Sequence, residues 1–345
     1  MRRIVPEGAS GPSVIAVGDS LSHLDAYCNA PGAVIITDAA VRRLHGMRFP
    51  VCEVIEIGMG EKSKTLTTVG EVYEAFLRLG VDRSSQVVAI GGGIVCDVTG
   101  FAASTYLRGL RFGFVPTTLL SQVDAGVGGK NGVNLHGYKN LVGTFTQPAF
   151  VLCDLDLLST LPEGELQNGF AEVIKQAAIG DASFFSFLET HAQEALRLDQ
   201  GVIERIIYSS LKIKAAIVSR DERESGERRK LNFGHTIGHA VEKVHHPSHG
   251  RAVSLGMSAA SRLSAAMGLL SQGDVERIEC LLAAFGLPLS MEIDGSLVWE
   301  ALWKDKKKTG KEIHFVLLEG IGNARVVPLS IDALKGVIDD LCQHR

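Results

Sequence analysis

Two histidines and an asparagine gather in a short glycine-containing stretch, Leu231–Ala240. If this stretch is a helix, His235 and His239 lie on one face, roughly 5–6 Å apart at Cβ, with Asn232 one turn upstream. Such a pair is typical of a metal site, but also of a helix whose histidines are satisfied in a core. The two glycines in the stretch argue against a purely structural helix, because each costs about 1 kcal/mol relative to alanine. They indicate that something comes close to this backbone.

Other residues with metal-binding side chains lie around this stretch. A catalytic zinc site typically uses three protein ligands, and two histidines with one carboxylate are a common set. Spacing alone favours His235 with His239, four residues apart, as the histidine pair. The candidate ligands are Glu172, His235, His239, His245, His246 and His249.

Three consecutive glycines stand between a strand-like and a helix-like run. Gly91-Gly92-Gly93 follows the apolar run Gln86–Ile90 directly. In α/β sheets ligands bind at the carboxyl ends of strands, and glycines there let backbone N–H groups and a helix N-terminus approach a pyrophosphate. The triplet is not the Gly-x-Gly-x-x-Gly fingerprint, so a dinucleotide site and a plain tight turn both remain open.

A long glycine-rich loop, Pro116–Lys130, comes next and is followed by Gly137–Asn140. Loops of this length in compact domains are usually functional or disordered, and this one has too many apolar residues for disorder. Lys130 and Lys139 are either solvated lysines or, as their glycine-rich setting favours, contacts to an anion.

Short apolar runs alternate with amphipathic stretches through the first half of the chain. Thr65–Leu79 carries its apolar residues on one helical face and ends at Gly80, which suits a helix C-cap. This alternation predicts an α/β fold with a parallel, Rossmann-like sheet. The expected strands are Ser13–Val17, Ala33–Thr37, Val51–Ile55, Gln86–Ile90, Arg111–Val115 and Ala149–Cys153.

The second half has a different pattern. From Ser159–Pro162 onward, long helical periodicity predicts a mainly α-helical domain. Asp274 and Gly286 bracket one helix as its N-cap and C-cap. Near the end, Glu312–Leu318 and Ala324–Pro328 are expected to form a small hairpin.

Composition narrows the class of protein. The chain has 345 residues, 46% of them apolar, which is enough for about two cores. A net charge of −4 offers no general field for nucleic acid or an acidic membrane, so an anionic ligand needs locally gathered cations. Six scattered cysteines without a Cys-x-x-Cys pair indicate mostly buried thiols in a reducing compartment. With neither a signal-peptide core nor a membrane-length apolar run, we expect a cytoplasmic protein.

Taken together, the motifs resemble the 3-dehydroquinate synthase family, a phosphosugar-cyclase branch of a superfamily that also holds metal-dependent polyol dehydrogenases. The resemblance runs from about Glu61 to Lys308. It rests on the glycine loop with Asp97 and on Pro116–Asp124, Val127–Lys130, Ala171–Lys175, Asp221–Glu224, Leu231–Ala240 and Asp305–Lys307.

The resemblance implies roles for particular residues. The metal ligands would be Glu172, His235 and His249, and His239 becomes a substrate-side group instead of a ligand. The implied NAD contacts are Asp38, Glu61, Lys64, Gly92, Gly93, Asp97, Thr117, Thr118, Lys139 and Thr160. The implied substrate and catalytic positions are Asp124, Lys130, Asn140, Lys175, Lys214, Glu224, Arg228, Asn232, His239 and either Lys306 or Lys307.

The family converts 3-deoxy-D-arabino-heptulosonate 7-phosphate to 3-dehydroquinate and phosphate, a step of the shikimate pathway of aromatic amino acid biosynthesis. NAD⁺ oxidises a ring hydroxyl held on a divalent metal, phosphate is eliminated, hydride returns and an intramolecular aldol closes the carbocycle. For this chain the resemblance therefore implies NAD and Zn²⁺ or Co²⁺ as cofactors. The carboxylate and phosphate of the substrate account for many cations in an acidic protein.

The resemblance also bears on assembly and shows three departures from the family pattern. Arg108 would complete the phosphate site of the neighbouring subunit in a homodimer, whereas the alternative is a solvated arginine at a helix C-terminus. Arg251 stands where the family usually has glutamate, and this reversed charge weakens metal binding unless it points outward or pairs with an acid. Cys96 replaces a typical glycine, and the segment between His239 and His249 is shorter than usual.

The nearest alternative is another sugar-phosphate cyclase, such as a 2-deoxy-scyllo-inosose or valiolone-type synthase, whose substrate lacks the carboxylate. Those enzymes usually differ at Arg228, Asn232 or His239. A polyol dehydrogenase would not need so many cations, and a non-catalytic scaffold is expected to have lost ligands or lysines, which this chain keeps. We therefore expect an NAD- and metal-dependent carbon–oxygen lyase with an NAD-binding domain at 1–159 and a metal- and substrate-binding domain at 160–345.

Overall fold

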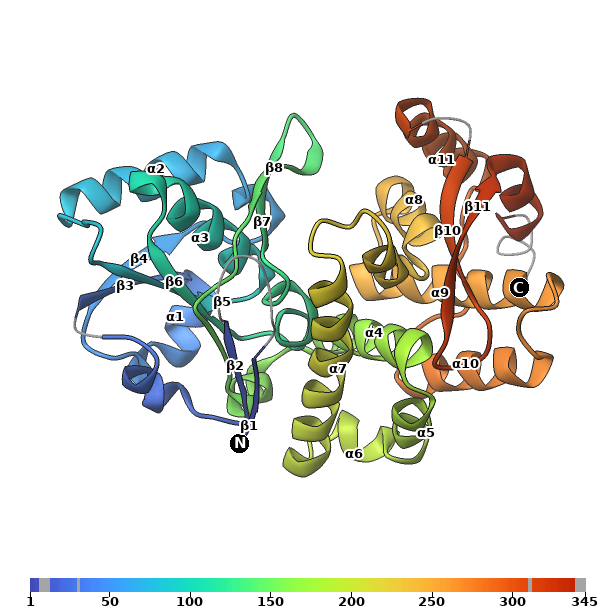
Figure 1. Cartoon of the computed structure of the whole chain (residues 1–345), viewed down its shortest axis with the longest axis horizontal. Coiled ribbons are helices and arrows are strands. Elements are labelled where there is room, and N and C mark those ends of the chain that lie inside the picture. The colour runs from blue at the N-terminus through green and yellow to red at the C-terminus, as the bar shows by residue number, and fades with distance from the viewer. Residues whose placement is uncertain (6–12, 30–31, 310–311, 339–345) are drawn as a thin grey trace. The chain divides into compact units, whose positions relative to one another are not determined.

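The computed structural model describes residues 1–5, 13–29, 32–309 and 312–338 (Figure 1). The chain divides into two compact units. The first comprises Met1–Pro162 and Ile203–Ser219, and the second comprises Glu163–Val202 and Arg220–Arg345. Most of helix α7 (Gln200–Arg220) therefore belongs to the first unit. The assignment of NAD to one part of the chain and of metal and substrate to the other stays a prediction.

A sheet of seven described strands lies at the centre of the first unit, in the order β1-β2-β9-β6-β5-β3-β4. Neighbouring strands among these seven pair in parallel, except that β1, at one edge of the sheet, pairs antiparallel with β2. The parallel sheet expected from the apolar runs is confirmed, whereas β1 was not predicted. The strands are β1 (Arg2–Ile4), β2 (Val14–Val17), β3 (Ala33–Asp38), β4 (Glu53–Ile57), β5 (Gln86–Gly91), β6 (Arg111–Pro116) and β9 (Phe150–Cys153).

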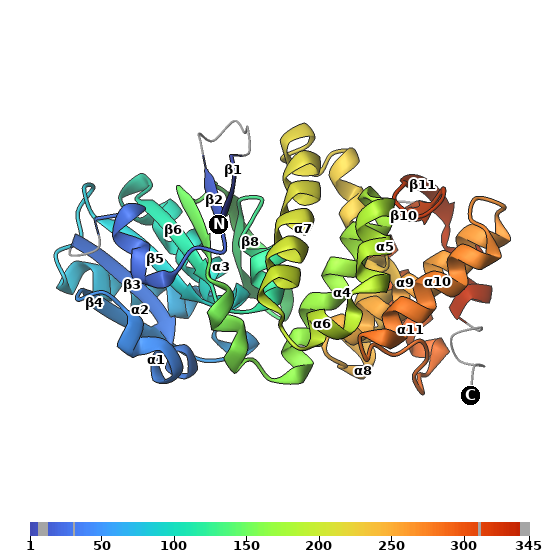
Figure 2. The same ribbon diagram turned by 90° about the horizontal axis from the view of Figure 1, so that it is seen from below.

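Helices cover both faces of this sheet (Figures 1 and 2). Across the sheet, the chain moves outward from β3 to the edge strand β4, and then moves back in the opposite direction to β5 and on to β6. Right-handed crossovers therefore place α1 (Ala39–His45) on one face and α2 (Leu66–Arg78) and α3 (Gly93–Thr105) on the other. The carboxyl ends of β3, β5 and β6 thus meet at one edge, together with the residues that follow them. Short 3-10 turns complete the unit at Leu21–Ala26, Gly46–Arg48, Glu61–Ser63, Tyr106–Arg108 and Leu155–Thr160.

The segment expected as a long loop is partly regular, which corrects the prediction. Ser121–Ala125 forms one π-helical turn, and β7 (Lys130–Leu135) pairs antiparallel with β8 (Tyr138–Phe145). His136 and Gly137 connect them, both with positive φ, as the favoured two-residue hairpin turns require. Glycine, lysine and asparagine in these strands hid the alternation that predicts a hairpin.

The described part of the second unit is mainly helical, as expected. In its core the aromatic rings of Phe170 and Phe285 pack together, with 4.6 Å between their centroids. The predicted hairpin is present as β10 (Glu312–Leu318) and β11 (Ala324–Ser330), which pair antiparallel and pack on α9 and the turn Glu227–Asn232. The helices are α4 (Glu163–Gly180), α5 (Ala182–Thr190), α6 (Ala192–Leu196), α8 (His235–His245), α9 (His249–Ala266), α10 (Gln272–Ala284) and α11 (Gly295–Thr309), followed by a 3-10 turn at Ile331–Leu334.

The start of α10 differs from the prediction. Ser271 is the N-cap, and Asp274, which was expected there, lies one turn inside the helix. Ser271 Oγ accepts the Asp274 backbone N–H at 3.1 Å and donates to its carboxylate at 2.9 Å. The serine therefore satisfies the free N–H of the first turn, and the acid in turn holds the serine. Gly286, with φ +70, follows the last turn as expected.

The stretch Leu231–Ala240 is not one continuous helix. A 3-10 turn, Glu227–Asn232, is separated from α8 by Gly234, whose φ of +77 favours glycine. Asn232 therefore does not share the helical face of His235. The expected close approach to the backbone is confirmed: a Cβ on Gly238 would lie 2.8 Å from the Ala252 carbonyl of α9. Gly234, the N-cap of α8, and Gly238 within it therefore serve the packing of α8 against α9.

Gly256→Ala is expected to destabilise this packing strongly. A Cβ on Gly256 would lie 1.8 Å from the Gly234 carbonyl oxygen, so α9 and the start of α8 must move apart. Overpacking of this kind costs about 1–3 kcal/mol or more in free energy of unfolding. Urea denaturation measures it. As a control, Gly70→Ala in α2 meets no atom within 4 Å and should instead add about 0.5–1 kcal/mol. Equal stability of wild type and Gly256→Ala would contradict this account of the helix pair.

Other expectations concern cysteines and membranes. Cys28, Cys96 and Cys153 are buried, Cys52 is partly buried, Cys280 is exposed, and all five are free thiols. Cys342 lies outside the described residues. Among the helices that the structure describes, none combines the length and the apolar character needed to cross a bilayer.

Candidate active site

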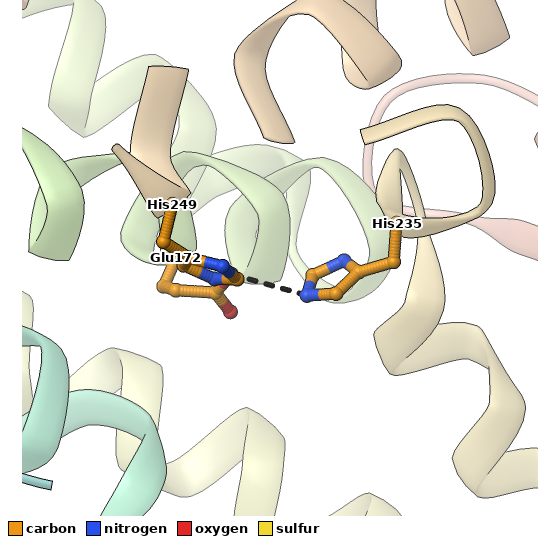
Figure 3. Close-up of side chains that lie close together, drawn as sticks. All are labelled: Glu172, His235 and His249. Atoms are coloured by element: carbon orange, nitrogen blue, oxygen red, sulfur yellow. Dashed lines mark hydrogen bonds and ion pairs between the residues drawn. The ribbon is translucent and has the colours of Figure 1, made fainter. Parts of the chain in front are cut away.

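Glu172, His235 and His249 form a compact group in the second unit (Figure 3). One ligand atom from each lies within 4.8 Å of the other two. Glu172 Oε1 is 3.2 Å from His249 Nε2 and 3.5 Å from His235 Nε2. Glu172 comes from the middle of α4, and the two histidines are the first residues of α8 and α9. The packing of three helices therefore brings together residues that are far apart in sequence.

The charges in this group are strongly coupled. Burial opposes ionisation of Glu172, but the charge of Lys175, one turn along α4, and the two imidazoles hold its pKa well below the usual value. Burial, with the positive charge of Lys175, lowers the pKa of His235 to about 3. Burial also disfavours protonation of His249, yet hydrogen bonds to Glu172 and Glu242 raise its pKa to about 9. Glu172 is thus ionised and His235 neutral, the forms in which they bind metals.

The donor set fits a divalent metal ion. Glu172 Oε2 is fully buried and, although it forms an ion pair with Lys175, it has no partner with hydrogen-bond geometry among the described residues. The ammonium of Lys175 compensates the charge on this oxygen, whereas Oε1 faces the two imidazoles and is the oxygen available to an ion. One carboxylate and two imidazoles are a ligand set typical of catalytic zinc.

The other candidate histidines lie differently. The His239 ring is 5.0 Å from that of His235 and 6.4 Å from that of His249, and the residue is exposed. His245 Nε2 accepts the Asp294 backbone N–H at 3.1 Å, so it holds the segment before α11. His246 is the left-handed residue, φ 54, that ends α8. His245 and His246 therefore have structural roles at the end of α8.

Arg251, the main departure from the family pattern, is exposed on the first turn of α9. It lies two residues after His249, and residues two apart on a helix do not share a face. Its charge therefore points away from the Glu172, His235 and His249 group, as the resemblance required for metal binding to be retained.

Lys64 is the centre of a polar cluster in the first unit. Its buried ammonium forms an ion pair with Asp97 and donates to Asn140 Oδ1 at 2.5 Å. Asn134 accepts the Asn140 backbone N–H at 2.8 Å and donates to Glu61 at 2.7 Å. Burial raises the pKa of Asp97 to about 6, against the opposing charge of Lys64. Three predicted NAD contacts and one predicted substrate contact therefore belong to a single network.

The glycine loop ends β5 and begins α3. Gly92 is the N-cap of the helix, and a Cβ there would lie 3.2 Å from Thr118. The Thr117 N–H donates to the Gly91 carbonyl at 2.9 Å, and the hydroxyls of Thr118 and Ser121 are 2.7 Å apart. Glycine thus lets the loop lie against the turn after β6, with the N-terminus of the 13-residue helix α3 beside it.

The remaining predicted NAD contacts are spread around the unit. Asp38 is the N-cap of α1 and accepts the Val41 N–H at 2.9 Å. Thr160 forms a hydrogen bond of 3.0 Å with His45, and Lys139 is exposed on β8.

The predicted substrate residues form smaller groups within each unit. In the first, Lys214 donates to Asp124 Oδ1 at 2.6 Å, whereas Lys130 and Arg108 are exposed. Leu107 and Arg108 have positive φ values of 49 and 69, so the backbone there is strained.

In the second unit, Arg228 is buried and donates to the Glu222 carbonyl at 2.5 Å, and Asn232 donates to Glu224 at 2.7 Å. The side chains of Lys306 and Lys307 lie outside the described part of the chain, so the choice between them stays open.

Two polar residues of these clusters were missed from the sequence. Asn134 joins Glu61 to Asn140 across the hairpin, and no local pattern marks it. Glu242 lies 3.5 Å from Nδ1 of His249. Its spacing of seven residues from His235 and three from His239 places it on their helical face, so that signal was present.

Comparisons with known sequences give one family. The family described as "3-dehydroquinate synthase N-terminal" matches residues 54–168, and "3-dehydroquinate synthase C-terminal" matches residues 169–308. The 3-dehydroquinate synthase of Pelobacter propionicus is 41% identical over 343 residues, which is 95% of this chain and 96% of that protein. The 3-dehydroquinate synthase of Geobacter sp. (strain M21) is 45% identical over 275 residues, covering 79% and 76%.

Solved structures of cyclases are also similar. A 2-epi-5-epi-valiolone synthase from Streptomyces hygroscopicus subsp. jinggangensis 5008, with NAD⁺ and Zn²⁺ bound, has a TM-score of 0.88 and 30% identity with full coverage of both chains. A 2-deoxy-scyllo-inosose synthase complexed with carbaglucose-6-phosphate, NAD⁺ and Co²⁺ has a TM-score of 0.85 and 27% identity, covering 98% of this chain and 99% of that one.

Proposed function

This chain belongs to the 3-dehydroquinate synthase family, and we propose that it converts 3-deoxy-D-arabino-heptulosonate 7-phosphate to 3-dehydroquinate and phosphate in the shikimate pathway. The observation that carries the proposal is the three-helix group of Glu172, His235 and His249 in a chain with this ancestry. The enzyme is then a carbon–oxygen lyase that needs NAD and Zn²⁺ or Co²⁺.

In this proposal Glu172, His235 and His249 hold the metal, and Lys175 balances the charge of the buried carboxylate. When bound, the metal supplies polarisation of a ring hydroxyl, and NAD supplies reversible hydride acceptance. His239 lies beside the ligands with an exposed ring, suited to moving a proton near the leaving phosphate. The buried guanidinium of Arg228 is suited to binding the carboxylate of the substrate.

The first unit is proposed to bind NAD. The N-terminus of α3 and the glycines before it suit a pyrophosphate, and the network of Lys64, Asp97 and Asn140 fixes side chains beside that loop. Lys214, held by Asp124, is proposed to meet the substrate. The protein is proposed to act as a homodimer in which Arg108 reaches the partner's site.

Other sugar-phosphate cyclases are the competing proposal. They are similar to this chain at 27–30% identity, whereas proteins named 3-dehydroquinate synthase reach 41–45%. Arg228, Asn232 and His239 also match the dehydroquinate pattern. We therefore propose that the substrate carries a carboxylate.

Phosphate release tests the proposal. Purified protein with NAD and either Zn²⁺ or Co²⁺ should release phosphate from the heptulosonate phosphate, and chelation should stop it. A sugar phosphate without the carboxylate, such as glucose 6-phosphate, should be turned over at least about tenfold more slowly, because the buried Arg228 is then left without its anion. Faster release from glucose 6-phosphate would favour the other cyclases.

His239→Ala is expected to keep stoichiometric metal but to lose about 100-fold or more in turnover. General acid–base residues typically contribute factors of 10²–10⁴. Metal analysis together with single-turnover kinetics measures both quantities. A loss of metal as large as that of His235→Ala would instead make His239 a ligand.

A further inference from the structure

We propose that Glu242 is a positioning residue of the metal centre, which fixes the ring of His249 so that Nε2 faces the ion. The proposal rests on the metal binding proposed above. It extends that function to a residue outside the ligand set.

The two ring nitrogens of His249 face two different carboxylates. Nε2 is 3.2 Å from Glu172 Oε1, and Nδ1 is 3.5 Å from Glu242 Oε2. With a metal bound, a carboxylate at Nδ1 would keep the proton on that nitrogen, so that Nε2, having given up its own proton, presents its lone pair to the ion. The ring is also held from both ends, so its rotation about the side-chain bonds is limited.

The connection between α8 and α9 explains why Glu242 reaches this ring. Only His246, Pro247 and Ser248 separate the two helices, so the first residue of α9 stays close to the last turn of α8. Glu242 lies in that turn, and its backbone carbonyl accepts the His246 N–H at 3.0 Å. The side chain is 18% exposed, so water screens the contact only in part.

Helix α8 therefore organises two of the three ligands. Its first residue, His235, is a ligand, and Glu242, seven residues later on the same face, orients a second ligand that belongs to α9. Two helical turns hold both residues at a fixed separation.

The alternative is that Glu242 itself binds an ion. His239, Glu242 and His249 also place ligand atoms within 4.8 Å of one another. This group uses an exposed histidine, whereas the group with Glu172 uses a fully buried carboxylate whose second oxygen lacks a hydrogen bond among the described residues. Burial strengthens the attraction between the Glu172 carboxylate and a divalent ion, so this group is the better metal site.

The test compares the metal affinity of wild type with Glu242→Ala and Glu242→Gln by competition with a chromophoric chelator. Loss of a carboxylate that orients a ligating histidine typically weakens metal binding about 10- to 100-fold. We expect Glu242→Ala near the upper end and Glu242→Gln, whose amide oxygen still accepts a hydrogen bond, near the lower end. The visible spectrum of the Co²⁺ forms should keep the band positions of wild type, because the ligand set is unchanged.

Glu279→Gln is the matched control. Glu279 is likewise 18% exposed on a helix of the same unit, where it pairs with Arg262, and its variant should bind metal as wild type does.

Three results would overturn the inference: unchanged affinity in Glu242→Ala, a loss no larger than that of Glu279→Gln, or a shifted Co²⁺ spectrum showing that Glu242 is a ligand. If wild type itself binds no metal, the proposed function fails first, and the two failures are thereby distinguished.

Discussion

Glu172→Ala, His235→Ala and His249→Ala are each expected to lose stoichiometric metal and essentially all turnover. The three side chains supply one ligand atom each within 4.8 Å, and a three-ligand site cannot lose one without losing most of its affinity. Glu172→Ala also leaves the buried ammonium of Lys175 without its counter-charge, so this variant should be the least stable of the three. Metal content after gel filtration, together with phosphate release, measures the effect.

His245→Ala and His246→Ala are the matched controls. Both replace histidines within four residues of His249, but one binds the Asp294 backbone and the other ends α8. They should keep stoichiometric metal, although His245→Ala loses a hydrogen bond worth about 1 kcal/mol. If His249→Ala kept its metal while these two variants lost it, the third ligand would be misassigned.

Arg108→Ala and Lys130→Ala, each nearly inactive alone, are expected to restore activity when unfolded and refolded together. Both side chains are exposed cations, and the backbone is strained at Leu107 and Arg108, where φ is positive. If Arg108 completes the neighbouring site of a two-fold dimer, a mixed dimer has one site with both cations intact.

The fraction of wild-type activity that should return follows from the statistics of dimer formation. Random refolding of equal amounts makes about half of the dimers mixed, and one of the two sites in each is intact, which gives roughly a quarter of wild-type activity. Mass spectrometry of the intact dimers measures the mixed fraction. Mixed dimers without recovered activity would mean that Arg108 serves its own subunit or no site.

Much of the fold could be predicted because burial leaves a local pattern. Gln86–Ile90 is apolar on both faces, as a central parallel strand must be, and it became β5. β1, with only Arg2–Ile4, is too short for any alternation to appear. The β7–β8 hairpin escaped because Asn131 stands on the face of Val133 and Leu135, and a glycine interrupts each strand, at Gly132 and Gly143, so no clear apolar alternation appears.

The candidate site shows a sharper limit. Spacing could pair His235 with His239 because they share a helix turn. It could not bring Glu172 to His249, because their proximity depends on how α4, α8 and α9 pack. That trio came only from the family resemblance. Lys64 and Asn140 are similarly far apart in sequence, and the hairpin that carries Asn140 was not predicted.

The stoichiometry of NAD during the reaction distinguishes the proposed cyclase from a dehydrogenase most directly. Purified protein is given the heptulosonate phosphate in large excess over NAD, and phosphate, 3-dehydroquinate and reduced cofactor are measured together. We expect equal amounts of phosphate and 3-dehydroquinate, many turnovers for each NAD and no net accumulation of NADH. NADH formed in proportion to the substrate consumed, without phosphate or 3-dehydroquinate, would show a dehydrogenase and contradict the account.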